Sequence, residues 1–170
     1  MNAVTLMIKS IFEQNEWKYT LDDNDETGID TFTSGFNLNN EKAHFQVRVY
    51  RESECYQILS SADSRVPLAS IAGALMAANE FNSYSRLVCC CVDTATGDVI
   101  FFKGTVTAGL TFSETAFEQE MNVLMAVTDT ETAQIIKKAV NYSPGNIPET
   151  PASEPQPRRG FFARLFQHQK

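Results

Sequence analysis

The sequence predicts a mixed α+β fold, a sandwich in which helices pack on an antiparallel sheet in the order α-β-β-β-α-β-β-α. Three observations lead to this prediction. Apolar residues recur at helical spacing in three segments, and they alternate with polar residues in the segments between them. Short polar turns, two of them containing glycine, join the alternating segments and suit antiparallel neighbours. With 170 residues, 43% of them hydrophobic, the chain can form one core but hardly two.

The first half of the chain is expected to form a helix followed by three or four strands. One face of the helix, at residues 3–15, collects the apolar side chains of Val4, Met7, Ile8, Ile11 and Phe12. Alternation then predicts strands at 17–21 and 29–38, which the polar run between them joins as a hairpin. A further strand is expected at 44–50, and the alternation at 56–58 indicates another.

A second helix is expected at 68–82, directly after Pro67, because proline is tolerated in a first helical turn. This helix is rich in alanine and glycine, so its backbone can lie close to a sheet or to a second copy of the chain. We therefore expect a homodimer that forms through this helix or an adjacent strand. The residues assigned to this packing face are Leu68, Ile71, Ala74, Leu75 and Ala78.

Two strands and a third helix complete the predicted domain. The segment 86–92 is apolar after its first residue, which indicates a strand covered on both faces, and a second strand follows at 99–106. The third helix is expected to begin at the capping box Thr111–Glu114. A second box, Thr128–Glu131, indicates that this helix restarts or bends there.

Three of the four cysteines are consecutive in the segment 86–92. In a strand Cys89 and Cys91 point to one face and Cys90 to the other, so the three thiols cannot converge on one metal ion. We interpret them as reduced packing residues, with redox sensing as the alternative, and we expect no metal and no cofactor. The fourth cysteine, Cys55, stands alone, which is typical of a cytoplasmic chain without a disulfide framework.

Charge and motif content argue against several classes of protein. The 21 acidic and 14 basic residues give a net charge of −7, which would repel a nucleic acid. No apolar run reaches the roughly 18 residues of a membrane-spanning helix, and the first residues lack a basic leader, so we expect a cytoplasmic location. Nucleophile elbows, phosphate-binding glycine loops and zinc-protease motifs are absent, so we expect no enzymatic activity.

The composition divides the chain into three regions. Residues 1–142 form the predicted α/β domain, and residues 143–157 hold five of the six prolines, as is typical of an extended linker. Residues 158–170 carry four basic and no acidic side chains, whereas the rest of the chain carries a charge of −11. We call residues 158–170 the tail.

The tail is amphipathic when projected as a helix, with four large apolar side chains on one side. We interpret it as a linear motif that binds a protein partner. The residues assigned to this role are Arg158, Arg159, Phe161, Phe162, Arg164, Leu165 and Phe166. Weak contact with an anionic membrane surface, docking on the chain's own domain, and no role at all remain alternatives.

Four segments carry a family resemblance: the strand WKYTLDD, the strand FQVRVY, the helix LASIAGALMAANEF and the closing NYSPG. Together with the element order, they resemble the YbjN-domain family of bacterial sensory-transduction regulators over residues 1–145. The fold of that family is similar to that of class I type III secretion chaperones. The resemblance implies a small sandwich, often dimeric, that binds protein segments along its sheet or central helix and uses no cofactor.

These observations predict a non-enzymatic protein-binding module or chaperone-like adaptor. It would engage a partner through the domain surface and through the tail. One alternative is a regulatory domain that senses a ligand in a pocket between sheet and helix. Another is a hydrolase with an unrecognised site, for which His44 is the candidate base within the domain.

Overall fold

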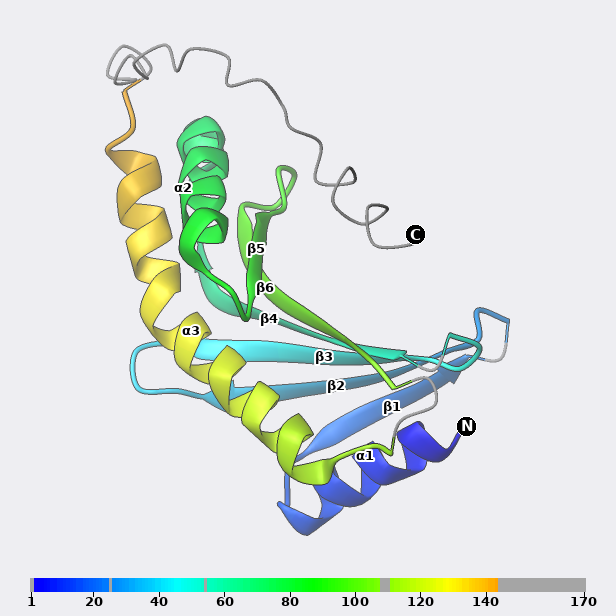
Figure 1. The fold of residues 1–170 in the computed structure, drawn as a ribbon. Helices are drawn as coiled ribbons and strands as arrows, with labels where there is room; N and C mark the ends of the chain where they lie inside the picture. The colour runs from blue at the N-terminus through cyan, green and yellow to red at the C-terminus, as the bar shows by residue number, and fades with distance from the viewer. Residues whose placement is uncertain (1, 25, 54, 108–110, 144–170) are drawn as a thin grey trace, which may run out of the picture.

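The computed structural model describes residues 2–24, 26–53, 55–107 and 111–143. They form one six-stranded antiparallel sheet and three α-helices, so the predicted α+β class is confirmed (Figure 1). Four strands, rather than three, precede the second helix. The elements are α1 (Ala3–Gln14), β1 (Tyr19–Asn24), β2 (Ile29–Asn37), β3 (Lys42–Tyr50), β4 (Cys55–Arg65), α2 (Ile71–Tyr84), β5 (Cys89–Val92), β6 (Asp98–Val106) and α3 (Glu114–Val140).

The strands lie side by side in the order β1-β2-β3-β4-β6-β5. The first four follow one another as a meander, because each is joined to the next by a short turn. Helix α2 then carries the chain to β5, and β6 returns between β5 and β4. The short strand β5 is therefore one edge of the sheet and β1 is the other.

All three helices pack on the same face of the sheet, which we call the inner face. The ring of Phe12 in α1 stacks on Phe32 of β2, with ring centroids 5.4 Å apart. Phe81 of α2 contacts Phe101 of β6 at 5.5 Å. Phe117 of α3 lies 5.6 Å from Tyr56 of β4. The opposite, outer face has no helix packed on it within the described part of the chain.

Helix α3 begins two residues later than the predicted capping box. Its N-cap is Ser113, whose hydroxyl accepts a hydrogen bond from the backbone N–H of Ala116 at 3.2 Å, so the assignment of Thr111 as the cap was wrong. The helix does not restart at Thr128–Glu131, although it changes direction along its length (Figure 1). None of the helices in the described ranges is both long and apolar enough to cross a membrane.

Helix α2 follows a short 3-10 turn, Leu68–Ser70, and buries its small residues within its own chain. A Cβ atom added to Gly73 would lie 2.5 Å from the backbone oxygen of Ala139 and 2.5 Å from Cβ of Tyr142, so the α2 and α3 backbones are in close contact there. Ala74 and Ala78 are also buried. The smooth face predicted from the sequence therefore packs against α3 and β5 of the same molecule.

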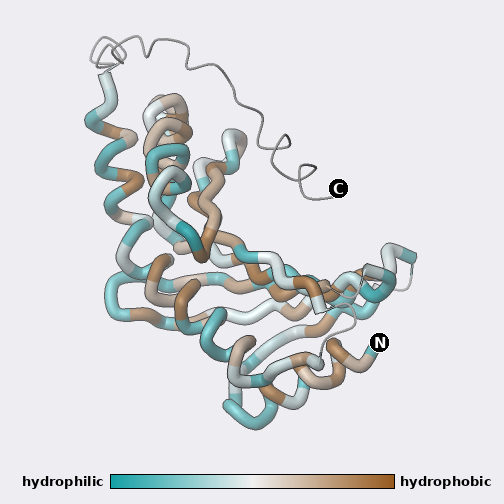
Figure 2. The backbone as a smooth tube through the Cα atoms, viewed as in Figure 1, coloured by the Kyte–Doolittle hydropathy of each residue, from teal (hydrophilic) through white to brown (hydrophobic). Residues whose placement is uncertain are grey.

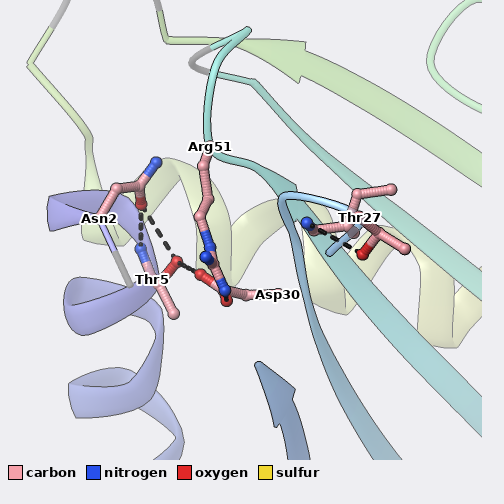
Figure 3. A network of polar contacts seen from close by, with 6 residues as sticks. Asn2, Thr5, Thr27, Asp30 and Arg51 are labelled. Carbon is pink, nitrogen blue, oxygen red and sulfur yellow. Dashed lines mark hydrogen bonds and ion pairs between the residues drawn. The ribbon is translucent and has the colours of Figure 1, made fainter. Parts of the chain in front are cut away.

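A buried polar network holds α1 against the sheet (Figure 3). The Asp30 side chain, on the inner face of β2, is fully buried and accepts a hydrogen bond from the Thr5 hydroxyl of α1 at 2.5 Å. Its other oxygen lies 2.6 Å from Nη2 of Arg51, at the end of β3. Asn2 caps α1 by accepting from the N–H of Thr5 at 3.0 Å. This network joins the first helix to two separate parts of the sheet.

Candidate functional site

The outer face of the sheet carries a band of apolar side chains across three neighbouring strands. Strand pairing places Cys89 of β5 opposite Phe102 of β6, and Phe102 opposite Leu59 of β4. Two residues further along β5, Cys91 lies opposite Ile100 of β6. We call these five residues the outer strip. Figure 2 shows hydrophobic positions recurring along β5 and β6, where the strip lies.

The strip ends where the outer face becomes polar towards β3. Gln46 of β3 lies beside Leu59, and His44 lies beside Ser61 of β4. Leu59, Ile100 and Phe102 are half-buried, whereas Cys89 and Cys91 are exposed. A partly exposed apolar band next to polar neighbours is typical of a surface that binds another molecule.

Two shallow hollows flank the strip. One, of about 280 Å³, is lined by the loop before β5 together with Cys89 and Phe102. The other, of about 190 Å³, is lined by Leu59, Ile100 and polar side chains of β3 that include His44. Both are smaller than the roughly 300–1,000 Å³ of typical small-molecule sites, so they suit side chains of a docked segment better than a whole ligand.

The cysteine prediction is correct in its alternation and in the burial of Cys90, and wrong for Cys89 and Cys91 as packing residues. Cys90 is buried, but Cys89 and Cys91 are exposed, because no helix among the described residues covers the outer face over β5. The expectation that segment 86–92 is covered on both faces was therefore wrong. Burial raises the pKa of the Cys90 thiol to about 12, and the neighbouring thiols contribute to this rise. Because its side chain is buried, Cys90 is a packing residue. The pKa of the Cys91 thiol is also raised, mainly by burial and secondly by the negative charge of Asp93.

The free edge of β5 is closed by side chains from the end of α2. The Asn82 amide donates to the backbone oxygen of Cys90 at 2.8 Å and accepts from its N–H at 2.7 Å, as a neighbouring strand would. The Ser85 hydroxyl donates to the oxygen of Val88 at 2.7 Å. These contacts cap the edge that an incoming strand would otherwise extend, so β5 presents its outer face rather than its edge.

The candidate base His44 lies on the open outer face. Its Nε2 atom is 2.5 Å from Oδ1 of Asp63, and both side chains are about half exposed. The hydrogen bond from His44, opposed by slight desolvation, holds the pKa of Asp63 below its usual value. Within the described part of the chain both side chains are open to solvent, which differs from the enclosed, preorganised setting of most catalytic sites. Within the described residues no group of three or more His, Cys, Asp or Glu side chains is arranged to hold a metal ion.

The residues assigned to a dimer face fall into two groups. Ala74 and Ala78 are buried in the core of their own chain, and Ile71 is partly buried. Leu68 and Leu75 are 61% and 46% exposed, and together with Met76 they leave an apolar stripe on the solvent side of α2 and the turn before it. The stripe is a separate surface from the outer strip.

Sequence reasoning missed part of the outer strip. Leu59, Ile100 and Phe102 alternate with buried residues along their strands, and this alternation was the available signal. It could not reveal that their side of the sheet is uncovered. The partner-binding residues predicted in the tail, from Arg158 to Phe166, lie outside the described residues, as does most of the predicted linker.

The fold and this surface together define a helix-backed antiparallel sheet with one open, partly apolar face. A family model with the description "Putative bacterial sensory transduction regulator", YbjN, matches residues 6–136. The chain belongs to the YbjN family. No curated protein matches the chain.

The chain is also similar in fold to a chain in "Crystal Structure of the ExsC-ExsE Complex". The TM-score is 0.53 at 13% sequence identity, and the match covers 79% of this chain and 97% of the other. The predicted likeness to the fold of a type III secretion chaperone is confirmed by this match.

Proposed function

We propose that this protein is a non-enzymatic protein-binding module, a chaperone-like adaptor that holds a protein segment on the outer face of its sheet. The observation that carries the proposal is the outer strip, an apolar band crossing β4, β6 and β5 with no helix of the described chain on it. Its partly exposed side chains can bury further apolar surface when an extended segment lies across them. The tail supplies a second point of contact with the same partner, and we place this activity in the cytoplasm.

The structural neighbour supports a protein partner, because it was crystallised as the ExsC-ExsE complex. Family membership and fold favour binding over catalysis. The ligand-sensing alternative concerns a pocket between sheet and helix. A hollow of about 300 Å³, at the lower limit of typical ligand sites, lies there between the β2–β3 turn (Asn37, Leu38, Asn39) and α3 (Met125, Ala126, Asp129). The exposed His44–Asp63 pair gives the hydrolase alternative little support, because solvent reaches it freely.

Replacing Phe162 and Phe166 by alanine should abolish capture of the partner, because buried aromatic anchors carry most of the affinity of such motifs. The measurement is cross-linking of the full chain in its native cell, followed by pull-down and identification of the partner by mass spectrometry. Phe102→Ser in the outer strip should weaken capture of the same partner.

The control is Leu6→Ser, which makes the same kind of apolar-to-serine change at an exposed side chain of α1, away from the strip. It should leave capture unchanged. Undiminished capture by the Phe162→Ala, Phe166→Ala variant would remove the tail from the mechanism, and undiminished capture by Phe102→Ser would remove the strip. Capture of no defined partner by the unaltered chain would refute the binding function itself.

We further propose that the protein is a homodimer formed through the solvent side of α2. The supporting observation is the apolar stripe of Leu68, Leu75 and Met76, which is exposed in the single chain. Because the small residues of α2 are already packed within the molecule, the second copy would contact this stripe rather than Ala74 or Ala78. Asn82 closes the adjacent edge strand, which favours contact between helices over a continuous sheet.

The double variant Leu68→Glu, Leu75→Glu should convert the dimer to a monomer, since like charges would meet across the two-fold interface. Multi-angle light scattering over micromolar concentrations measures the change as a halving of the mass. Leu6→Glu, which places the same charge at an exposed leucine of α1, should keep the dimer mass. A strictly monomeric mass for the unaltered chain would disprove the dimer.

A further inference from the structure

The chain leaves the domain at the same end of the molecule as the β5–β6 turn, with α2 and the sheet between the end of α3 and the outer strip. Helix α3 ends at Val140, and the residues on either side of this end, Ala139 and Tyr142, contact Gly73 in the first turn of α2. The turn between β5 and β6 is held at the same end, because the N–H of Val66, just before α2, donates to the oxygen of Gly97 at 2.9 Å. Figure 1 shows the end of α3, the start of α2 and the β5–β6 turn at one end of the molecule.

This end of the strip carries more acidic than basic groups. Asp93 lies at the β5–β6 turn, Asp98 begins β6, and Asp63 lies near the end of β4. The cations there are Arg65, whose Nε atom is 2.8 Å from Oδ1 of Asp98, and Lys42, whose charge also acts on Asp63. His44 pairs with Asp63. The surface therefore suits a basic segment.

The charge of the tail is complementary to this surface, and two of its basic residues precede its apolar ones. Its two leading arginines, Arg158 and Arg159, would reach the acidic end first. The apolar residues Phe161, Phe162, Leu165 and Phe166 follow them. The linker at 143–157, at about 3.1 Å per residue when extended, reaches about 45 Å. That exceeds the roughly 30 Å length of a nine-residue strand such as β6, so the tail can reach any part of the strip.

We propose that the tail binds the outer strip of its own molecule, with its phenylalanines against Leu59, Ile100 and Phe102 and its arginines beside the carboxylates at the β5–β6 turn. This inference goes beyond the proposed function, because it concerns the protein with no partner bound. A partner that uses the strip then has to displace the tail. The tail covers an apolar surface that would otherwise remain open to water.

The linker raises the fraction of time for which even a weak contact between tail and strip is formed. A short linker holds the tail at an effective concentration of about 1 mM near the domain. A contact with a dissociation constant of about 0.1 mM would then be formed about nine-tenths of the time. Side chains beneath the docked tail should consequently react about tenfold more slowly with a reagent in solution.

Cys89 and Cys91 are native reporters of this contact, because they are exposed thiols within the strip. In the full chain without partner, iodoacetamide should alkylate both thiols about tenfold faster after Phe162→Ala, Phe166→Ala than in the unaltered protein. Peptide mass spectrometry resolves each site. Cys55, at the far end of β4, should react at the same rate in both, and buried Cys90 should stay unreactive, which shows that the fold is intact.

Gln167→Ala is the matched control, since it changes the tail outside its four apolar side chains, and its rates should equal those of the unaltered chain. High salt should also speed alkylation of the unaltered chain, because it screens the arginine contacts. Equal rates for the unaltered chain and the double phenylalanine variant would overturn the proposal. Protection that grows with protein concentration would also overturn it, because a second copy would then cover the strip. Either result would leave the proposed binding function standing, because partner capture is measured in a separate experiment.

Discussion

Replacing Asp30 by alanine should lower the free energy of unfolding by about 3 kcal/mol, as breaking a buried ion pair does when it leaves a charge without its partner. The Asp30 side chain is fully buried, and the Arg51 side chain that binds it is only 19% exposed. The Thr5 hydroxyl would also lose its acceptor, which loosens α1 from the sheet. Urea unfolding followed by Trp17 fluorescence measures the change.

Asp30 should also make stability depend on pH in the acid range. Burial alone would raise its pKa, but the hydrogen bonds from Arg51 and Thr5 and the charge of Arg51 outweigh burial and hold the pKa below its usual value. A carboxyl group with a lowered pKa in the folded state contributes stability above its unfolded pKa of about 3.9 and loses it as the pH falls through the folded value. The unaltered protein should therefore lose stability below about pH 4 more steeply than Asp30→Ala.

The control for Asp30 is Glu13→Gln, which removes a surface ion pair with Lys9 whose two side chains are largely exposed. It should change the free energy of unfolding by less than about 0.5 kcal/mol. Equal stability and equal acid sensitivity of Asp30→Ala and the unaltered protein would show that the network does not hold α1.

Replacing Gly73 by alanine should lower the free energy of unfolding by about 2 kcal/mol, against the usual gain from removing glycine from a helix. The added Cβ would lie 2.5 Å from the oxygen of Ala139 and from Cβ of Tyr142, so α3 would have to move away from α2. Thermal or urea unfolding measures the loss. The matched control is Gly104→Ala, because nothing lies within 4 Å of a Cβ at that position.

Gly104→Ala should stay within about 0.5 kcal/mol of the unaltered protein. A neutral effect of Gly73→Ala would mean that α2 and α3 are not in close contact in solution. The small-residue face of α2 would then be available to a second copy, as the sequence alone suggested.

The sequence predicted the elements well where one face of each is buried. The stripe containing Ile8 and Phe12 in α1, and the alternation along β3, are patterns of consecutive residues that depend only on local geometry. The opposite orientation of Cys90 from its neighbours followed for the same reason. The family resemblance also came from local patterns in their order along the chain, and the matching family model agrees with it.

The positions of helix caps were predicted less well. Thr111 and Ser113 both stand near an acidic residue, and only the path of the chain before α3 decides which hydroxyl meets a backbone N–H. The burial of Asp30 also could not be predicted, because a single aspartate in an alternating strand looks the same whether Arg51 and Thr5 reach it or not.

By itself, the sequence determined the kind and order of the elements, apart from the fourth strand before α2, and the contrast between the acidic domain and the basic tail. The tertiary structure alone decided which surfaces are covered. It placed β6 between β4 and β5, brought Leu59, Ile100 and Phe102 together into one open band, and packed the small residues of α2 against α3. The physical reason is that alternation shows that a strand has two different faces. Which face a helix covers depends on contacts between residues far apart in the chain, which no local pattern contains.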